Sequence, residues 1–334
     1  MNSISSRFTK VKRRLLGVAG IGIAASLALA GCSPADSGTD TPDDSETFVI
    51  GVSEVSTEIP FLATLDASIK SKAEELGGSA VILNGELDIA KQIANIRELI
   101  AQQVDAIIVI CGDPTGPVDA INEAVEAGIP VFAVNAKLDD AAQVVTYVGA
   151  SDFDYGVAQG ELLIQALPDG GKVALILGYL GGVPQVQRLA GLEEAIKNHP
   201  EIEIVEQPTD DFDNQKNLAV VQDLLAKYPE GTLDAIVAQG PQLYVGANYA
   251  QEQGRDDILF IAGDYPTEIE DAIKSGAIYG TVDQSPVTQG ELGAQYVYDW
   301  IRGDKDQVPT PEFLTELPLV TKDNVDDNPS SWSF

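Results

Sequence analysis

Short apolar runs alternate with longer amphipathic stretches from Phe48 onward. A short apolar run rich in β-branched residues fits a buried strand, whereas apolar residues that recur every three or four positions form one face of a helix. In the first half of the chain this pattern predicts strands at 48–52, 80–83, 107–110 and 129–134, and helices at 61–76 and 89–100. The run 107–110 is apolar at every position, which is typical of a central strand in a parallel sheet.

The same alternation starts again after residue 170. It predicts strands at 172–177, 202–205, 233–238 and 258–262, and helices at 185–198 and 214–228. The tripeptide Asp-Ala-Ile opens a predicted strand in both halves, at 105–107 and at 234–236, which is a weak sign of duplication. Alternating strands and helices imply parallel sheets with right-handed crossovers, and ligands of such folds bind at the carboxyl ends of the strands. The sequence therefore predicts an α/β protein with two similar lobes.

The N-terminal part has the features of an export signal. Five basic residues precede an apolar run from Leu15 to Ala30, which at about 16 residues is too short for an ordinary membrane span. The run ends in Ala30-Gly31-Cys32, which resembles a bacterial lipobox. This resemblance implies a signal peptide at 1–31 and lipidation of Cys32, with palmitate as an expected acyl chain; an uncleaved signal anchor is the alternative. The polar segment 32–47 is expected to be a flexible tether, so the mature domain would be anchored to the outer face of the cell membrane.

Charge and cysteine content restrict the possible partners. Loss of residues 1–31 would leave 15 Lys and Arg against 52 Asp and Glu, a net charge of −37. Such an acidic surface argues against binding to nucleic acid or to anionic lipid. With Cys32 lipidated, Cys111 is the one remaining cysteine, so no intramolecular disulfide is possible. We expect a monomer that is soluble apart from its anchor.

The sequence lacks the usual signs of an enzyme. It contains no Gly-x-Gly-x-x-Gly between a strand and a helix and no phosphate-binding loop, and the prolines between Gly112 and Pro117 would interrupt a row of backbone amides. The only histidine, His199, follows a helix, and Cys111 has no histidine near it in the sequence to activate it. We therefore expect no catalysis, no cofactor and no metal site.

Five short motifs occur in an order that resembles the ribose-binding family of type I periplasmic binding proteins, from about residue 48 to residue 322. They are Ile59-Pro60-Phe61-Leu62, Arg188 followed by Gly191 to Ile196, Asp211-Phe212-Asp213, Gly263-Asp264, and Thr281 to Pro286. The resemblance implies two Rossmann-like lobes joined by a hinge of three strands. By this analogy the N-lobe comprises 48–151 with 285–316 and the C-lobe 152–284 with 317–327. Residues 328–334 would form a frayed tail, in which Trp332 is the residue that could dock.

The resemblance also implies a function and a ligand site. A lipoprotein of this family captures a sugar or a similar small polar molecule by closure of its lobes and delivers it to the permease subunits of an ABC importer. A sugar needs an apolar platform and planar polar side chains that form paired hydrogen bonds. The matching positions are Phe61 and Phe212 for stacking, Arg188 and Asp264 for paired hydrogen bonds, Gln284 as an amide, and Asn135 after the fourth strand.

Each of these residues also has a simpler interpretation. Phe61 could be the first core residue of its helix, Phe212 a cap over a helix start, Arg188 a solvated helix residue, Asp264 the N-cap of the next helix, and Gln284 a hinge residue that bonds to backbone.

The chain departs from the family pattern at several polar positions. Ile59 stands where the family has Asn, Asn135-Ala136 where it has Asp-Arg, and Gly240 where it has Asn. A buried polar group without a partner costs about 1–3 kcal/mol, so we expect a polyol, a deoxy sugar or a non-sugar metabolite as the ligand in place of ribose. Lys137, Glu54 and Gln239 are close enough in sequence to supply replacement contacts.

Two other classes of protein share this fold. A transcriptional repressor would need a DNA-binding N-terminus, and here a predicted export signal stands in its place. A ligand-presenting lipoprotein that serves a sensor kinase or a chemoreceptor is the stronger alternative, because its sequence would have the same features.

Overall fold

The computed structural model describes residues 47–334. The predicted signal peptide, the predicted lipidation site Cys32 and nearly all of the predicted tether lie outside the described residues. Within 47–334, every helix is too short or too polar to cross a bilayer.

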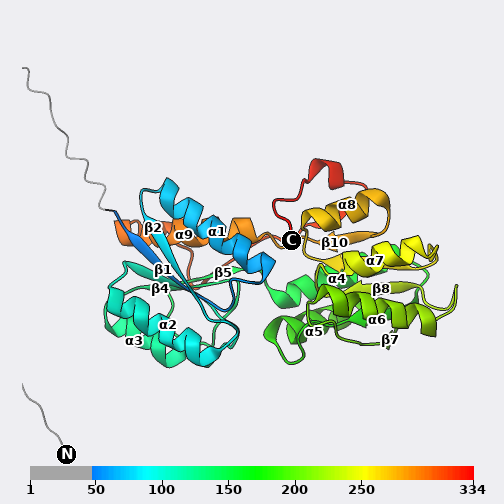
Figure 1. The fold of residues 1–334 in the computed structure, drawn as a ribbon, viewed down its shortest axis with the longest axis horizontal. Helices are drawn as coiled ribbons and strands as arrows, with labels where there is room; N and C mark the ends of the chain where they lie inside the picture. The colour runs from blue at the N-terminus through cyan, green and yellow to red at the C-terminus, as the bar shows by residue number, and fades with distance from the viewer. Residues whose placement is uncertain (1–46) are drawn as a thin grey trace, which may run out of the picture. The chain divides into compact units, whose positions relative to one another are not determined.

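The first sheet has six parallel strands in the order β2-β1-β3-β4-β5-β11 (Figure 1). These strands are β1 (Val49–Glu54), β2 (Ser79–Asn84), β3 (Ala106–Ile110), β4 (Val131–Val134), β5 (Tyr147–Gly149) and β11 (Glu312–Leu314). Its helices are α1 (Pro60–Glu75), α2 (Ile89–Gln102), α3 (Val118–Glu126) and α9 (Pro286–Arg302). Ile108 of β3 packs in the core beneath α1 and α9, while its neighbour Ile107 packs in the core beneath α2 and α3. Both faces of the sheet are thus covered, as the wholly apolar run of β3 requires.

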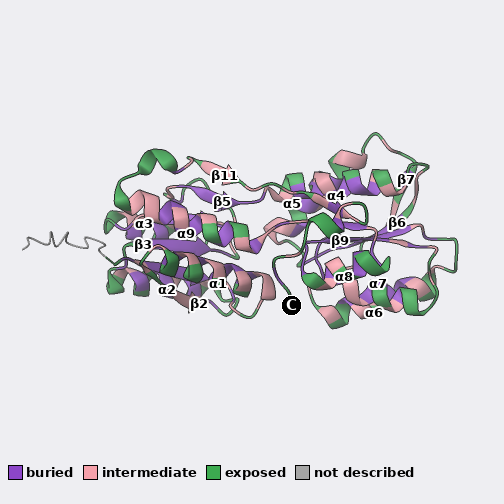
Figure 2. Cartoon of the chain, turned by 90° about the horizontal axis from the view of Figure 1, so that it is seen from above, coloured by how far each residue is buried: buried purple, intermediate pink, exposed green. Residues whose placement is uncertain are grey.

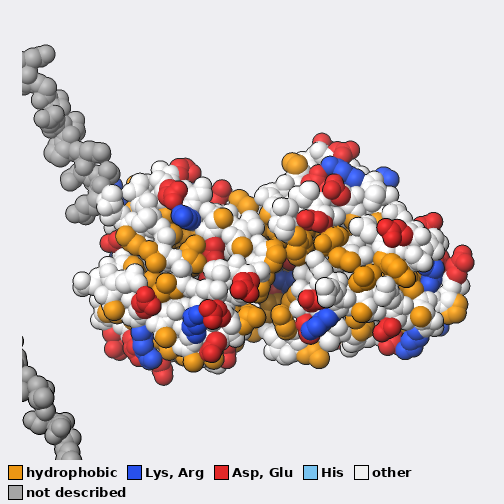
Figure 3. All heavy atoms as spheres, in the orientation of Figure 1, with side chains coloured by type: hydrophobic (Ala, Val, Ile, Leu, Met, Phe, Trp, Pro, Cys, Tyr) orange, Lys and Arg blue, Asp and Glu red, His pale blue; other side chains and the backbone are white. Residues whose placement is uncertain are grey.

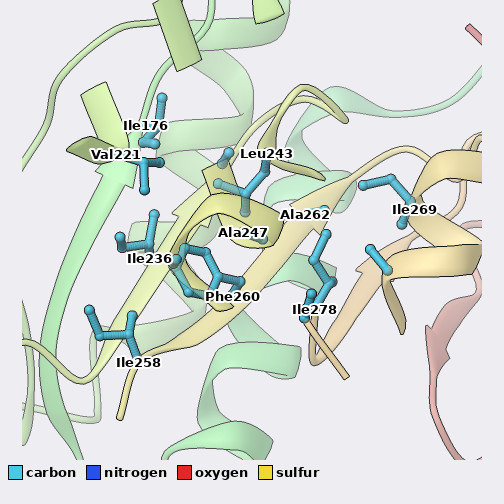
Figure 4. Close-up of a cluster of buried hydrophobic side chains, with 14 of the residues drawn as sticks. Ile176, Val221, Ile236, Leu243, Ala247, Ile258, Phe260, Ala262, Ile269 and Ile278 are labelled. Carbon is cyan, nitrogen blue, oxygen red and sulfur yellow. The ribbon is translucent and has the colours of Figure 1, made fainter. Parts of the chain in front are cut away.

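The second sheet has the order β7-β6-β8-β9-β10-β12, in which β12 alone is antiparallel to its neighbour. Its strands are β6 (Gly171–Ile176), β7 (Ile202–Glu206), β8 (Ala235–Ala238), β9 (Leu259–Gly263), β10 (Gly280–Val282) and β12 (Leu319–Thr321). One face is covered by α4 (Asp152–Ala166) and α5 (Val183–Ile196). The other is covered by α6 (Asn214–Lys227), α7 (Leu243–Glu252) and α8 (Thr267–Ser275), around the apolar cluster that includes Phe260 and Ile236 (Figure 4).

The chain passes between the two sheets three times. It leaves the first sheet after β5, returns after β10 and leaves again after β11. We call the elements of the first sheet the N-lobe and those of the second sheet the C-lobe; in each, buried strands lie between more exposed helices (Figure 2). This architecture confirms the predicted α/β fold of two parallel-stranded lobes joined by three crossings.

The predicted strands and helices occur within about two residues of their expected positions. The pattern did not reveal β5, β10, β11 and β12, each only three residues long, because a strand of that length carries too few alternations to be recognised. It gave no full bounds for α3, α7 and α8 and did not reveal α9. It also did not reveal α4, whose buried face includes Gly156 and Gly160.

These glycines allow α4 and α5 to cross closely. A Cβ atom on Gly156 would lie 2.0 Å from the carbonyl oxygen of Arg188, and one on Gly191 would lie 2.0 Å from the carbonyl oxygen of Phe153. Both contacts are with backbone atoms, so a larger side chain could be accepted only by moving one helix away from the other. The close crossing thereby fixes the backbone that carries Arg188.

We expect Gly191→Ala to lower the free energy of unfolding by about 1–3 kcal/mol, although alanine favours helix formation by about 1 kcal/mol over glycine. Urea unfolding followed by circular dichroism measures the change. Gly293→Ala is the matched control in α9, where the new Cβ atom would lie 3.0 Å from Cγ2 of Val134, a side-chain methyl group that can shift. Equal stability of Gly191→Ala and the parent would contradict the close crossing.

The C-terminal tail, residues 328–334, is held on the C-lobe, which corrects the expectation of a frayed end. The Tyr265 hydroxyl donates to the carbonyl oxygen of Asn328 at 2.7 Å, and the Ser330 hydroxyl donates to the carbonyl oxygen of Tyr265 at 2.7 Å. The backbone N–H of Thr267, at the start of α8, donates to the carbonyl oxygen of Trp332 at 2.8 Å. The first N–H groups of a helix lack partners inside the helix, and the tail provides one. Trp332 is only 6% exposed.

Candidate functional site

A cavity of about 870 Å³, which we call the interlobe cavity, is lined by residues of both lobes. The N-lobe contributes residues that follow β1, β2, β3 and β4, and the C-lobe contributes residues that follow β6, β7, β8, β9 and β10. The cavity therefore lies at the carboxyl ends of the strands, where α/β folds bind ligands. Hydrophobic side chains gather on the surface where the two lobes meet (Figure 3). All six residues predicted to bind the ligand line this cavity: Phe61, Asn135, Arg188, Phe212, Asp264 and Gln284.

Arg188 is held by three groups of the C-lobe. Its Nε atom donates to Oδ1 of Asp152 at 2.9 Å, and Nη1 donates to the carbonyl oxygen of Gln239 at 2.8 Å. The guanidinium carbon lies 3.9 Å from the centre of the Tyr155 ring, within the range of a cation–π contact. Three restraints on one planar group fix its orientation at the cavity wall.

The fixed guanidinium still has hydrogen-bonding capacity. Within residues 47–334, Nη2 of Arg188 makes no hydrogen bond, so its two N–H groups are available to a guest. Burial by itself would lower the pKa of Arg188, but the charges of Asp152, Tyr155 and Asp264 outweigh burial and raise this pKa overall. The side chain is thus a permanent cation with an oriented donor edge.

Asp264 faces the cavity from the end of β9. Its backbone is in the left-handed region at φ +54°, and its N–H donates to the Tyr155 hydroxyl at 2.6 Å. Oδ1 accepts hydrogen bonds from the Tyr155 hydroxyl and from Nε2 of Gln284, both at 3.2 Å. Burial raises the pKa of Asp264 to about 6, opposed by Arg188 and by these two donors. Among the described residues Oδ2 has no hydrogen-bond partner, which makes it an acceptor for a guest.

Two amide side chains extend this polar wall. Gln284, which lies between β10 and α9, is buried and bonds to Asp264. Asn135, which follows β4, has φ +63° and donates from Nδ2 to Oε1 of Gln289 at 3.0 Å. The backbone carbonyl oxygen of Asn135 accepts a hydrogen bond from the Tyr147 hydroxyl at 3.0 Å. One hydrogen bond to another side chain therefore orients each of the two amides.

The two predicted aromatic residues come from different lobes. Phe61 lies in the first turn of α1, partly packed on the N-lobe core. Phe212 lies before α6 with φ +54°, and its ring stands edge-to-face against Tyr179 with the ring centres 5.9 Å apart. A Cβ atom on Gly178 would lie 2.1 Å from Cζ of Phe212, so this glycine makes the ring position possible.

The simpler interpretations can now be compared with the structure. The interpretation of Arg188 as a solvated residue is wrong, because the residue is 6% exposed and paired with Asp152. Asp264 is not a helix cap, since the N-cap of α8 is Pro266. Gln284 bonds to a side chain and not to backbone. The helix cap next to Phe212 is Asp213, whose side chain accepts from the N–H of Lys216. For Phe61 the core contact is real, but the residue also lines the cavity.

The three suggested replacement residues differ in their positions. Lys137 lines the cavity but pairs with Glu312 at 2.6 Å. Glu54 is fully buried and does not line the cavity. Gln239 does not line the cavity but supports its wall. Its side-chain amide accepts from the N–H of Gly178 and donates to the carbonyl oxygen of Gln185. Its backbone carbonyl oxygen accepts from Arg188. Of the three, only Lys137 has direct access to a guest.

Sequence reasoning missed the residues that hold Arg188 and Asp264 in place. Asp152 and Tyr155 belong to α4, an element that the apolar pattern did not reveal. Ser151 followed by acidic residues at 152 and 154 is a helix-start signal that could have located it. Gln242, Trp332 and Phe334 also line the cavity, and no motif marks them.

Cys111 and His199, the two residues considered above as possible catalytic groups, lie in different surroundings. Cys111 lines the cavity, but burial raises the pKa of its thiol to about 11, so the reactive thiolate is scarce at neutral pH. His199 is partly exposed and contacts Glu201. Among residues 47–334, no group of three or more His, Cys, Asp and Glu side chains is arranged to hold a metal ion.

A smaller cavity of about 340 Å³ lies near the start of β9. None of the six residues predicted to bind the ligand lines it.

Several known proteins are similar to this chain over most of its length. The ribose import binding protein of Haemophilus influenzae is 29% identical over 273 residues, which are 80% of this chain and 90% of that protein. The xylitol-binding protein of Mycolicibacterium smegmatis is 27% identical over 307 residues, 91% of this chain and 84% of that protein. A solved ABC transporter solute binding protein from Bacillus halodurans, with bound myo-inositol, is 28% identical with a TM-score of 0.76, and the match covers 85% of this chain and 98% of that one.

A family model described as the periplasmic binding protein domain matches residues 50–305. This span runs from β1 past the end of α9 and so includes the first two of the three crossings between the lobes. The chain therefore belongs to the periplasmic binding protein domain family.

Proposed function

We propose that this protein is the solute-binding subunit of an ABC importer and that it captures a sugar or a sugar-like polyol between its lobes. The observation that carries the proposal is the convergence of Phe61 and Asn135 from the N-lobe with Arg188, Phe212 and Asp264 from the C-lobe on one cavity. Such a site can be complete only when both lobes contact the same guest.

The wall has the chemistry that a polyhydroxylated guest requires. Nη2 of Arg188 offers a pair of donors, and Oδ2 of Asp264 offers an acceptor. A hydroxyl group donates and accepts at once, so vicinal hydroxyls can satisfy both residues. Phe61 and Phe212 supply apolar surface for the C–H faces of the guest. A strongly anionic guest would meet Asp152, Asp264 and the acidic surface, which disfavour it.

Relatives narrow the class of guest. The proteins compared above carry the names ribose import binding protein and xylitol-binding protein, and the solved structure holds myo-inositol. A cavity of about 870 Å³ lies within the usual range of about 300–1,000 Å³ for small-molecule sites. We favour an uncharged polyol or cyclitol, because the match to the xylitol-binding protein covers 91% of this chain and the match to the structure with bound myo-inositol covers 85% of it.

Capture follows from hinged closure of the lobes. Contacts to residues of both lobes form together only in the closed arrangement, so a guest shifts the population toward it. The lobe boundaries that fit this motion are 48–151 with 285–316 and 152–284 with 317–327. The closed form would be presented to permease subunits, and lipidation at Cys32 would keep the monomer at the outer face of the cell membrane.

A thermal-shift screen tests the function. With xylitol, myo-inositol, D-ribose and D-galactose as probes, at least one should raise the melting temperature of the purified protein. At 100 times the dissociation constant a ligand stabilises by about 2.7 kcal/mol, which corresponds to a rise of roughly 4–5 °C for a chain of this size. Sodium glutamate, a charged molecule of similar size, serves as the control. Absence of a shift with every sugar and polyol, confirmed by calorimetry, would exclude the proposed ligand class.

A further inference from the structure

The C-terminal tail brings an aromatic side chain into contact with the opposite lobe. The tail is hydrogen-bonded to the C-lobe, yet the Trp332 ring stands edge-to-face against Phe61 of the N-lobe, with ring centres 5.6 Å apart and planes at 88°. Phe334 packs on Trp332 and on Tyr244, with ring centres 5.8 and 5.7 Å apart. Trp332 and Phe334 both line the interlobe cavity. The tail is thus part of the cavity wall.

Two buried polar atoms of this wall have no partner. Within residues 47–334, neither Nε1 of Trp332 nor Oε1 of Gln242 makes a hydrogen bond, although the two residues are only 6% and 7% exposed. Folded proteins rarely leave buried polar atoms unpaired. One atom is a donor and the other an acceptor, and a hydroxylated guest can satisfy both.

The space for the Gln242 side chain is created by a glycine. A Cβ atom on Gly240 would lie 2.6 Å from Oε1 of Gln242 and 2.6 Å from Cδ1 of Phe212. The amide oxygen therefore lies beside the ring of Phe212, in the volume that a side chain at position 240 would occupy. Gln242 thus places a polar atom next to a ring that we assign to stacking.

We propose that Trp332 and Gln242 contact the guest: the indole N–H of Trp332 donates to a guest oxygen, and Oε1 of Gln242 accepts from a guest hydroxyl. This inference rests on the proposed function and extends it, because it makes the C-terminal tail a binding element. It also implies that the guest presents oxygens toward the tail side of the cavity as well as toward Arg188 and Asp264.

Two conservative variants test the two contacts. Trp332→Phe keeps one aromatic ring and removes the N–H, and Gln242→Leu puts a slightly shorter apolar side chain in place of the acceptor. Calorimetry with whichever of xylitol, myo-inositol and D-ribose binds the parent most tightly should show about 3- to 10-fold weaker binding for each variant, the usual effect of one lost neutral hydrogen bond. Without the probe, the melting temperature of Gln242→Leu should equal that of the parent or rise, since this variant removes an unpaired buried atom. The melting temperature of Trp332→Phe should fall slightly, since the smaller ring packs less on Phe61 and Phe334.

The chain provides its own matched control, because it contains only two tryptophans. Trp300 lies in α9, where it packs on Phe132 and Lys305 and does not line the cavity. Trp300→Phe should bind the probe like the parent, and its remaining tryptophan emission should shift when the probe is added. If the parent binds a probe and Trp332→Phe and Gln242→Leu bind it equally well, the inference is wrong while the function stands. If no probe binds the parent, the function and the inference fail together.

Discussion

Replacing Arg188 with alanine should abolish polyol binding and lower the free energy of unfolding by about 3–5 kcal/mol, the usual cost of removing one partner from a buried ion pair. Asp152 would lose its partner at 2.9 Å, and the carbonyl oxygen of Gln239 would lose its donor at 2.8 Å. The Tyr155 ring would lose the cation that covers it. Calorimetry with the best-binding polyol and urea unfolding measure the two effects.

Two further variants separate binding from stability. Arg188→Lys keeps the charge but lacks the planar fork, so it should recover part of the stability while binding stays weak. Arg255→Ala is the matched control, because Arg255 and Asp257 form a similarly buried pair whose side chains are 13% and 16% exposed, away from the interlobe cavity. It should destabilise the fold and leave affinity unchanged. Parent-like affinity of Arg188→Ala would show that the guest does not use this guanidinium.

Stability should be greatest in weakly acidic solution, near pH 4–5, and should fall as the pH rises toward 7. Burial raises the pKa of Asp264 to about 6 and that of Asp283 to about 7, above the value of about 3.9 for an unfolded Asp. Between the unfolded pKa and the folded pKa of each group, the folded state binds more protons than the unfolded state. The free energy of unfolding therefore falls as the pH rises from about 4, and the whole contribution is lost once the pH exceeds the folded pKa. On the acid side, Arg255 lowers the pKa of Asp257 to about 2, and that contribution is lost as the pH falls from about 4 to 2.

A pair of buried carboxyl groups should contribute most to this pH dependence. Glu54 ends β1 and Asp66 lies in α1; they are 0% and 5% exposed. Burial raises the pKa of both groups, and the charge of Asp66 raises that of Glu54 further. Oε1 of Glu54 accepts from the N–H of Val55 at 2.6 Å, but neither oxygen of Asp66 has a hydrogen-bond donor outside the pair among the described residues. The pair is stable with a shared proton and unstable when both groups ionise.

Asp66→Asn should therefore stabilise the protein at pH 8 by about 1–3 kcal/mol, because an amide cannot ionise and can donate to Glu54. Melting temperatures measured from pH 4 to pH 8 should show a smaller decline for this variant than for the parent. Asp326→Asn, at a side chain that is 89% exposed, controls for the general reduction of negative charge. A parent-like decline in Asp66→Asn would show that other groups cause the pH dependence.

The fold was predictable because its signals are local. Apolar runs at the strands, helical spacing of apolar residues and glycines after helices all reflect burial of one face or both faces of an element. Candidate site residues were predictable as well, since Phe61, Arg188, Phe212 and Asp264 occur in motifs that resemble those of the ribose-binding family. Elements that pack through glycine, such as α4, gave no such signal.

By itself, therefore, the sequence determined the two-lobed α/β architecture, and its resemblance to the ribose-binding family indicated six candidate residues that line one cavity. Only the tertiary structure revealed three further features: the contacts of Asp152 and Tyr155 with Arg188, the unpaired atoms of Gln242 and Trp332, and the buried pair of Glu54 and Asp66. These depend on contacts between residues 12 to about 270 positions apart, such as Trp332 with Phe61 and Asp66 with Glu54. Local spacing carries no information about such contacts, because they form only when the packed helices and the crossings between the lobes bring distant segments together.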